Sequence, residues 1–202
     1  MPLANSGRAA PLVDEIGRAR ALEYSLLAVL LAKAPSVDLL ARLALLEADD
    51  SALGTAHAEL AAAAASARWE NVEREFFDLF IGVGRGELLP YGSYYLAGTL
   101  HDRSLSRLRA DLARLGVARV EACGEPEDHA AMLCEIMASL IDGRFDTPPD
   151  ADRDLFTSHL DPWIGRFFAD LEQARAAHFY RSVALAGQCF MQIEREAFKL
   201  AA

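Results

Sequence analysis

The sequence lacks an apolar run long enough to cross a membrane. Its 202 residues are 52% hydrophobic, but alanine inflates that share, as in residues 61–65. No stretch approaches the roughly 18 apolar residues that a spanning helix requires. Residues 1–8 also lack the basic start and apolar core of a secretory signal. These absences predict a soluble protein, with one core or two closely packed subdomains, that stays in the cytoplasm.

Cysteine is scarce, and basic residues are in the minority. Cys123, Cys134 and Cys189 are an odd number of cysteines at unrelated spacings, so the sequence indicates neither a disulfide framework nor a paired zinc site. We expect them to be small buried hydrophobic residues. The formal net charge of -10 argues against binding to nucleic acid, whose phosphates require basic patches, and it leaves a basic partner open.

Alternation of period two, the mark of a strand, is nearly absent, whereas apolar residues recur at three- and four-residue steps along almost the whole chain. This pattern predicts an all-α fold. Pro35 and Gly116 mark two of the expected helix ends. Helices are expected over residues 12–33, 37–46, 51–65, 68–81, 104–115 (capped by Ser104), 126–142 and 176–200, with one more apolar stripe over 156–171 that restarts after a capping Asp161.

Residues 117–125 interrupt the helical pattern and divide the chain. We expect a single-chain, bundle-like helical fold with an N-terminal subdomain over 1–116, a hinge over 117–125 and a C-terminal subdomain over 126–202. The C-terminal part opens on Gly124-Glu125-Pro126-Glu127-Asp128-His129. Pro126 suits the first turn of a helix, and the acids after it complement the positive end of the helix dipole. Ordinary capping alone therefore accounts for this motif.

No arrangement typical of catalysis is found. The run Gly82-Val83-Gly84-Arg85-Gly86 follows an expected helix rather than a strand, has Glu87 where a dinucleotide fingerprint requires glycine, and is not followed by a P-loop Lys-Ser/Thr pair. The histidines include no pair at the i, i+4 spacing of a helical metal site. Asp128 and His129 are not tied to a nucleophile elbow. The sequence thus predicts neither an enzyme nor a bound metal or cofactor.

The glycines within residues 82–86 are expected to end a helix and to carry the chain across a neighbouring surface. Leu88, Leu89, Pro90 and Tyr91 would then lie exposed or half-exposed on a loop, as at the lip of a peptide-binding groove. Burial of these side chains in the core is an equally good interpretation.

Four motifs in order carry a resemblance to a known family. They are Leu79-Phe80-Ile81-Gly82, Pro90-Tyr91-Gly92-Ser93-Tyr94-Tyr95, Glu125-Pro126-x-Asp128-His129 and His159-Leu160-x-x-Trp163-x-x-x-Phe167. As a set, the motifs resemble the TorD/DmsD family of cytoplasmic chaperones, which mature molybdoenzymes exported by the twin-arginine route. The resemblance implies an all-α chaperone that is either a monomer or a homodimer whose domains swap about the hinge.

The resemblance also implies a partner and a site. The partner is the precursor of a molybdopterin-containing oxidoreductase. The overall sequence pattern of the chain is most similar to that of members associated with formate dehydrogenases. The signal-peptide surface of the family matches Phe76, Leu79, Phe80, Pro90, Tyr91, Ser93, Asp128 and His129. The sequence departs from many members at Leu89-Pro90-Tyr91, where they have consecutive prolines and a tryptophan.

Physical reasoning supports that assignment, because a twin-arginine signal joins two guanidinium groups to an apolar stretch. Its receptor needs carboxylates beside a hydrophobic groove. We therefore add Glu127 to Asp128 as a candidate arginine ligand, and Leu88 and Leu89 to the apolar contacts. One alternative is a guanine-nucleotide- or molybdopterin-binding protein with weak or no GTPase activity. Another is a helical interaction module unrelated to export.

Overall fold

The computed structural model describes residues 14–117 and 125–200, and within these ranges the chain forms helices and no β-strand. The predicted all-α fold is confirmed. The elements are α1 (Glu15–Ala32), α2 (Val37–Leu43), α3 (Ala52–Ser66), α4 (Trp69–Phe76), η1 (Phe77–Ile81), α5 (Gly92–Ala97), α6 (Arg103–Arg114), α7 (Ala130–Ile141), α8 (Ala151–Leu155), η2 (Phe156–Leu160), α9 (Ile164–Gln173) and α10 (Phe179–Leu200).

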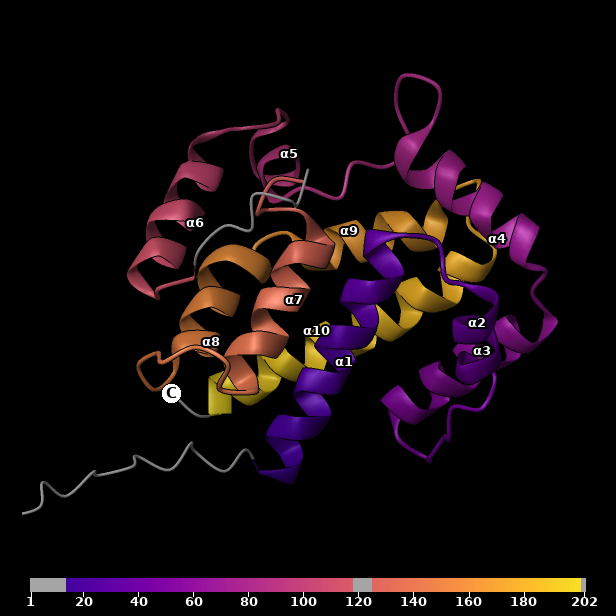
Figure 1. Cartoon of the computed structure of the whole chain (residues 1–202), viewed down its shortest axis with the longest axis horizontal. Coiled ribbons are helices and arrows are strands. Elements are labelled where there is room, and N and C mark those ends of the chain that lie inside the picture. The colour runs from indigo at the N-terminus through magenta and orange to yellow at the C-terminus, as the bar shows by residue number, and fades with distance from the viewer. Residues whose placement is uncertain (1–13, 118–124, 201–202) are drawn as a thin grey trace, which may run out of the picture.

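Helix pairs that are distant in sequence build the core. α1 packs along α7, and α10 packs against both α9 and α3 (Figure 1). Tyr24, Trp163 and Tyr180 are among the largest side chains that are fully buried. Each helix removes an apolar face from water in this arrangement, so packing supplies most of the stability of helices that would be marginal alone.

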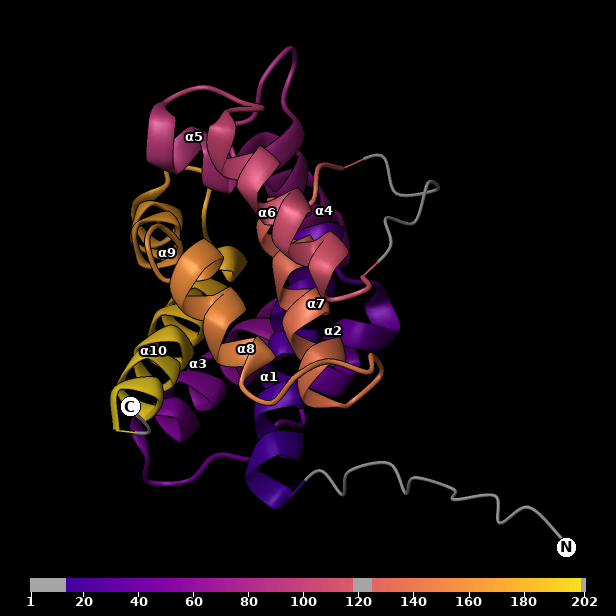
Figure 2. The ribbon, with the colours of Figure 1, turned by 90° about the vertical axis from the view of Figure 1, so that its left-hand side faces the viewer.

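α5 and α6 lie at one end of the molecule, away from α2 and α3 (Figures 1 and 2). α6 buries Leu105, Leu108 and Leu112, which follow one another at three- and four-residue steps on one face. α5 contacts α6 and also α9. The two short helices are thus held at this end by their inner faces.

The two elements η1 and η2 are wide π-helical turns that continue α4 and α8. In η1 the carbonyl of Phe77 accepts a hydrogen bond from the N–H of Gly82 at 2.7 Å, and in η2 the carbonyl of Phe156 accepts one from Asp161 at 2.9 Å. Turns of this kind are rare and are often found at functional sites. The helix predicted over 68–81 is present, with its last turn widened.

The predicted helix start at Pro126 is wrong, because α7 begins at Ala130. Residues 125–129 instead form a turn that ends in an isolated antiparallel bridge between His129 and Tyr91. The carbonyl of Pro90 accepts a hydrogen bond from the N–H of Ala130 at 2.8 Å. A partner distant in sequence therefore holds His129 in an extended conformation, and the helix starts only after it.

Two predicted caps are also wrong. α6 begins at Arg103, so Ser104 lies within its first turn rather than before it. Asp161 does not cap α9, which begins at Ile164, and its carboxylate pairs with Arg195 of α10. The ion pair with Arg195 engages the carboxylate that the sequence analysis expected to cap α9.

Close helix contacts cross the predicted boundary between the two subdomains. α1 and α3 precede the predicted hinge, and they pack against α7 and α10, which follow it. Residues 118–124 of that hinge lie outside the described residues, so the division stays a prediction. Within the described parts of the chain, no helix combines the length and the apolar character that a membrane span requires.

Candidate functional site

The loop that joins η1 to α5, residues 82–91, is here called the apolar loop. Gly82 has a φ of +60°, a conformation that favours glycine. The N–H of Leu88 donates to the carbonyl of Leu79 at 2.8 Å. A Cβ atom on Gly86 would lie 2.5 Å from that same carbonyl oxygen. Glycines therefore end the helix and let the chain turn back closely against η1, as the sequence predicts.

The first half of the candidate site packs on α10. Phe76 and Leu79 are buried, whereas Phe80 and Leu88 are half-buried against the same core. The ring of Phe80 lies 5.1 Å from that of Phe76 and 5.5 Å from that of Tyr180. Phe76 and Leu79 consequently belong to the core, and Phe80 and Leu88 form its edge under the apolar loop.

The second half gathers where the apolar loop meets the turn before α7. The rings of Tyr91 and His129 meet edge to face at 5.1 Å. The Tyr91 hydroxyl donates to Glu125 Oε2 at 2.6 Å, and burial together with this bond raises the pKa of Tyr91. Pro90 is buried here, while Leu89 and Tyr91 are half-buried. The loop thus connects the two halves of the predicted site, which are separate clusters.

His129 is a buried cap rather than a proton donor at an open site. Its Nδ1 atom accepts a hydrogen bond from the N–H of Ala131 at 3.1 Å, at the start of α7. Burial lowers the pKa of His129 against the opposing effect of Glu125 and Asp128. A neutral imidazole is the form that can accept this bond, so burial and capping favour the same protonation state.

The two acids that precede His129 have different partners. Glu127 Oε2 accepts hydrogen bonds from Arg109 of α6, whose Nε and Nη2 atoms both lie 2.9 Å away. Asp128 is 4% exposed, and its Oδ2 accepts the N–H of Ser93 at 2.7 Å, at the start of α5. Its Oδ1 atom is buried and accepts no hydrogen bond from the described part of the chain.

Asp128 lines a small cavity of about 90 Å³, here called the Asp128 pocket. Ser93 Oγ and Ser104 Oγ are also buried without a hydrogen-bond partner among the described residues, and both residues line this pocket. Buried polar atoms are rarely left unpaired. The lining residues are Gly92, Ser93, Leu96, Ser104, Arg107, Leu108, Asp128, Ser158 and His159.

The pocket contains residues that the sequence did not assign to a site. Ser104 comes from α6, and Ser158 and His159 come from η2. His159 Nε2 lies 2.7 Å from Asp111 Oδ2, and burial lowers the pKa of His159. The signal for His159 was present in the His-Leu-x-x-Trp motif, whereas nothing in the sequence singles out Ser104.

Close packing of glycine against tryptophan shapes the pocket. A Cβ atom on Gly92 would lie 3.0 Å from Trp163 Nε1 and 3.6 Å from Asp128 Cβ. The Trp163 Nε1–H donates to the carbonyl of His159 at 2.7 Å. Gly92 therefore allows α5 to approach Trp163 and brings Ser93 to Asp128.

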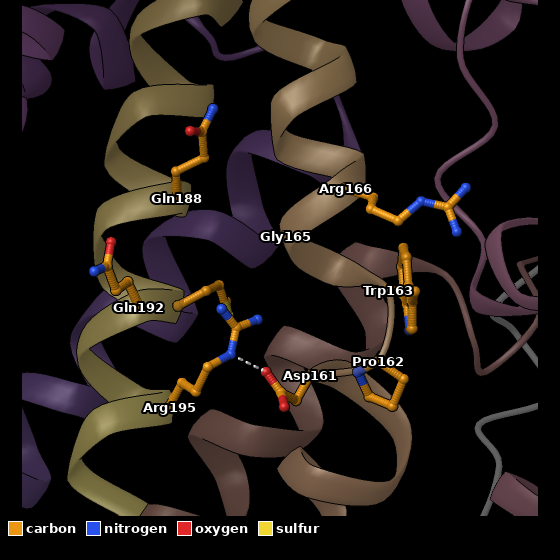
Figure 3. Close-up of a pocket in the computed structure, with 9 residues that line it drawn as sticks. Asp161, Pro162, Trp163, Gly165, Arg166, Gln188, Gln192 and Arg195 are labelled. Carbon is orange, nitrogen blue, oxygen red and sulfur yellow. Dashed lines mark hydrogen bonds and ion pairs between the residues drawn. The ribbon is translucent and has the colours of Figure 1, made fainter.

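A second, larger cleft of about 410 Å³ lies between α9 and α10 (Figure 3). Gln188, Gln192 and Arg195 line it from α10, and Arg195 is paired with Asp161. The Arg166 side chain points away from α10 in Figure 3, and its NH1 donates to the carbonyl of Tyr95 at 3.2 Å. This cleft is polar, but the described residues that line it leave no buried polar atom unpaired.

No group of three or more metal-ligating side chains occurs within residues 14–117 and 125–200. The site consists of hydrogen-bonding and apolar groups, with two buried carboxylates, those of Glu127 and Asp128. Groups of this kind are suited to holding a ligand by hydrogen bonds and apolar contact.

Comparison with known proteins places this chain in a family. The profile of the family described as nitrate reductase delta subunit matches residues 46–169. Over 130 residues the chain is 28% identical to the chaperone protein TorD of Vibrio cholerae, a match that covers 60% of this chain and 59% of that protein. Over 118 residues it is 28% identical to the Tat proofreading chaperone DmsD of Haemophilus influenzae, covering 57% and 56% of the two chains.

The fold is shared with a solved structure. A redox enzyme maturation protein from Archaeoglobus fulgidus superposes with a TM-score of 0.59 over 86% of this chain and 93% of its own, at 21% identity. At this identity the likeness shows a shared all-α fold. The chain belongs to the nitrate reductase delta subunit family, and the resemblance to TorD and DmsD that the sequence motifs indicated is confirmed.

Proposed function

We propose that this chain is a cytoplasmic chaperone that binds the twin-arginine signal peptide of a molybdoenzyme precursor, during cofactor insertion and before export. The names of its relatives TorD and DmsD support the chaperone class. The match spans less than two thirds of those relatives, so the client is also part of the proposal. That client is a molybdopterin oxidoreductase resembling formate dehydrogenase, and the protein acts without catalysis as a monomer or a domain-swapped homodimer.

The observation that carries the proposal is the continuity between the apolar loop and a buried carboxylate. Leu89 and Tyr91 are half-buried near the end of the loop, and the next two residues, Gly92 and Ser93, donate backbone hydrogen bonds to Asp128. A signal peptide has the same order of chemistry, with arginines next to an apolar segment. An apolar helix turn seated on the loop would bring a neighbouring arginine toward the acid.

Electrostatics favour such a ligand over an acidic one. The formal net charge of -10 attracts a basic segment and speeds the encounter at low ionic strength. Apolar burial on the loop would then provide the part of the affinity that salt does not screen. The binding free energy should therefore contain a salt-sensitive and a salt-insensitive part.

Calorimetric titration with a synthetic twin-arginine signal peptide tests the proposal. Leu89→Ala should weaken binding by about 1 to 2 kcal/mol without changing its salt dependence, because it removes only apolar contact. Val83→Ala is the matched control, because Val83 is 98% exposed at the far end of the same loop. Absence of binding by the unaltered protein would refute the proposed function.

The alternative ligand, a guanine nucleotide or molybdopterin, is favoured by one feature, the size and polarity of the cleft between α9 and α10 (Figure 3). GTP binding can be followed by fluorescence of a labelled analogue. If that cleft is the site, Gln192→Leu should abolish nucleotide binding and leave peptide binding unchanged. We expect no GTP hydrolysis above background, because the chain has no P-loop.

A further inference from the structure

α1 is apolar on two opposite faces. Its inner face packs into the core, and its outer face carries a second line of apolar side chains, here called the α1 stripe. The α1 stripe consists of Ala19, Leu22, Leu26 and Val29. Leu22 is 64% exposed and Val29 is 43% exposed, on a helix that crosses in front of α10 in Figure 1. A surface helix normally turns polar side chains to the solvent, so this face has the composition of a contact surface.

The members of the α1 stripe follow one another at steps of three, four and three residues. This is the spacing of a coiled-coil seam, in which each apolar side chain inserts between those of a facing helix. Glu15 precedes the stripe by four residues, and Lys33 follows it by four. The steps are therefore the same in both directions, with their centre at position 24. Such a pattern fits an antiparallel copy of itself.

An antiparallel second α1, related to the first by a two-fold axis beside position 24, would meet a complementary residue at each level. Leu22 would lie opposite Leu26 of the second copy. The small Ala19 would lie opposite the larger Val29, so that the volumes match.

The two ends of this pairing are complementary in charge. Glu15 would lie opposite Lys33 of the second copy, once at each end. Both residues are exposed, and neither forms an ion pair within residues 14–117 and 125–200. A parallel pairing would instead set glutamate against glutamate and lysine against lysine, so the charges favour the antiparallel arrangement.

We propose that the α1 stripe is the interface of a homodimer in which two α1 helices pack antiparallel about a two-fold axis. The same surface then serves both subunits, and the assembly closes at two copies. This dimer requires no exchange of subdomains, unlike a swapped one, and it does not depend on the proposed peptide site.

The size of α1 sets the strength of the dimer. The helix has 18 residues, which is about 27 Å at the usual rise per residue. One helix pair of this length buries less area than a standard interface, so the dimer should be weak, with a Kd on the order of tens of micromolar.

Sedimentation equilibrium at increasing concentration tests the inference. The unaltered protein should show a reversible monomer–dimer equilibrium, and a protein that stays monomeric at about 0.5 mM would overturn the inference. Leu22→Glu should weaken the dimer about a hundredfold or more, because it removes two apolar side chains from the seam and places two carboxylates there. Leu45→Glu is the matched control, because Leu45 is 80% exposed between α2 and α3. It should leave the dimer and the melting temperature unchanged.

Charge reversal tests the antiparallel register. Glu15→Lys and Lys33→Glu should each weaken the dimer about tenfold at low ionic strength, because both end pairs change from attraction to repulsion. An equimolar mixture of the two variants should associate as tightly as the unaltered protein, since an acid faces a base at both ends of the mixed dimer. Glu47→Lys, at an exposed position outside α1, should behave like the unaltered protein. If mixing does not restore association, the helices are not antiparallel and the inference fails.

Other outcomes identify a different assembly. A dimer that survives Leu22→Glu uses another surface, and one that exchanges subunits only after unfolding is domain-swapped, so either result refutes the inference. If Leu22→Glu weakens binding of the signal peptide, the α1 stripe is a peptide surface, which also overturns it. Loss of the dimer with unchanged peptide binding supports the inference. The proposed function is judged separately, by the calorimetric titration of the unaltered protein.

Discussion

Glu75 of α4 caps the start of α10 through Tyr180, whose N–H donates to Glu75 Oε1 at 2.7 Å. The same carboxylate accepts the N–H groups of His178 at 2.8 Å and Phe179 at 3.1 Å. Glu75 is 6% exposed. A residue more than a hundred positions away thus satisfies the backbone donors that the first turn of α10 leaves unpaired.

We expect Glu75→Ala to lower the free energy of unfolding by about 3 kcal/mol or more, because it leaves several N–H donors without an acceptor at once. Urea unfolding followed by circular dichroism measures this change. Glu73→Ala, at an exposed position of the same helix, should alter stability by less than about 0.5 kcal/mol. Equal effects of the two variants would contradict the capping role.

A second prediction concerns Glu194, which is fully buried on α10 and binds Arg20 through both carboxylate oxygens at 2.7 and 2.8 Å. The Tyr24 hydroxyl donates to the same carboxylate at 3.0 Å. Glu194→Ala should cost about 3 to 5 kcal/mol, because it leaves the Arg20 charge without its main partner. Glu196→Ala breaks an exposed pair with Lys199 and should have almost no effect on the urea midpoint.

The third prediction tests the fit between α5 and Trp163. Gly92→Ala should destabilise the protein by about 1 to 3 kcal/mol, because the added Cβ would lie 3.0 Å from Trp163 Nε1 and 3.2 Å from Cε2. The tryptophan fluorescence should shift at the same time. Gly165→Ala is the control, since the nearest atom to its Cβ is the flexible Arg195 NH2 at 3.5 Å. A silent Gly92→Ala would show that α5 is free to move.

The fourth prediction concerns pH. Burial lowers the pKa of His129 and His159 below the ordinary value of 6.5. At a pH near or below 6.5, where these histidines are protonated in the unfolded chain but less so in the folded protein, the unfolded chain therefore binds more protons than the folded one. Stability should fall as the pH is lowered from about 7.5 to about 5.

His57 acts in the opposite sense. The Glu23 carboxylate, 3.0 Å from His57 Nε2, raises the pKa of His57 above 6.5. The contribution of His57 to stability is therefore present at low pH and is lost as the pH rises through its folded-state pKa. His129→Asn keeps a side chain suited to an N-cap and should flatten the pH dependence of the urea midpoint. His57→Gln should steepen it, and the reverse order in these two variants would rule out this explanation.

The sequence predicts the all-α class because helical periodicity is a local property, repeated in almost every segment. It fails at residues 126–129 for the opposite reason. Pro126 and the acids after it obey every local rule for a helix start, but the bridge from Tyr91 holds His129 extended. Such a bridge depends on the neighbour that the fold brings alongside, and no local rule contains it.

For the candidate site, the sequence and the structure can be compared only in where the named residues lie. The motifs named Tyr91, Ser93, Asp128 and His129, which the fold brings together. The resemblance also implied Phe76 and Leu79 as site residues, yet both are buried in the core. An apolar stripe on a helix has the same sequence pattern whether it faces a groove or the interior. Ser104 was missed as a site residue, since its value comes only from facing the same cavity as Asp128.

The bridge between Tyr91 and His129 also ties together the two ends of the segment that contains α5 and α6. The N–H of Gly92 donates to the carbonyl of Asp128 at 2.9 Å, and the N–H of Ala130 donates to the carbonyl of Pro90 at 2.8 Å. The segment that contains α5 and α6 therefore leaves and rejoins the rest of the structure at the same place. Because the main chain makes both hydrogen bonds, substitutions of side chains between residues 92 and 129 would leave these bonds, and so the starting points of α5 and α7, in place.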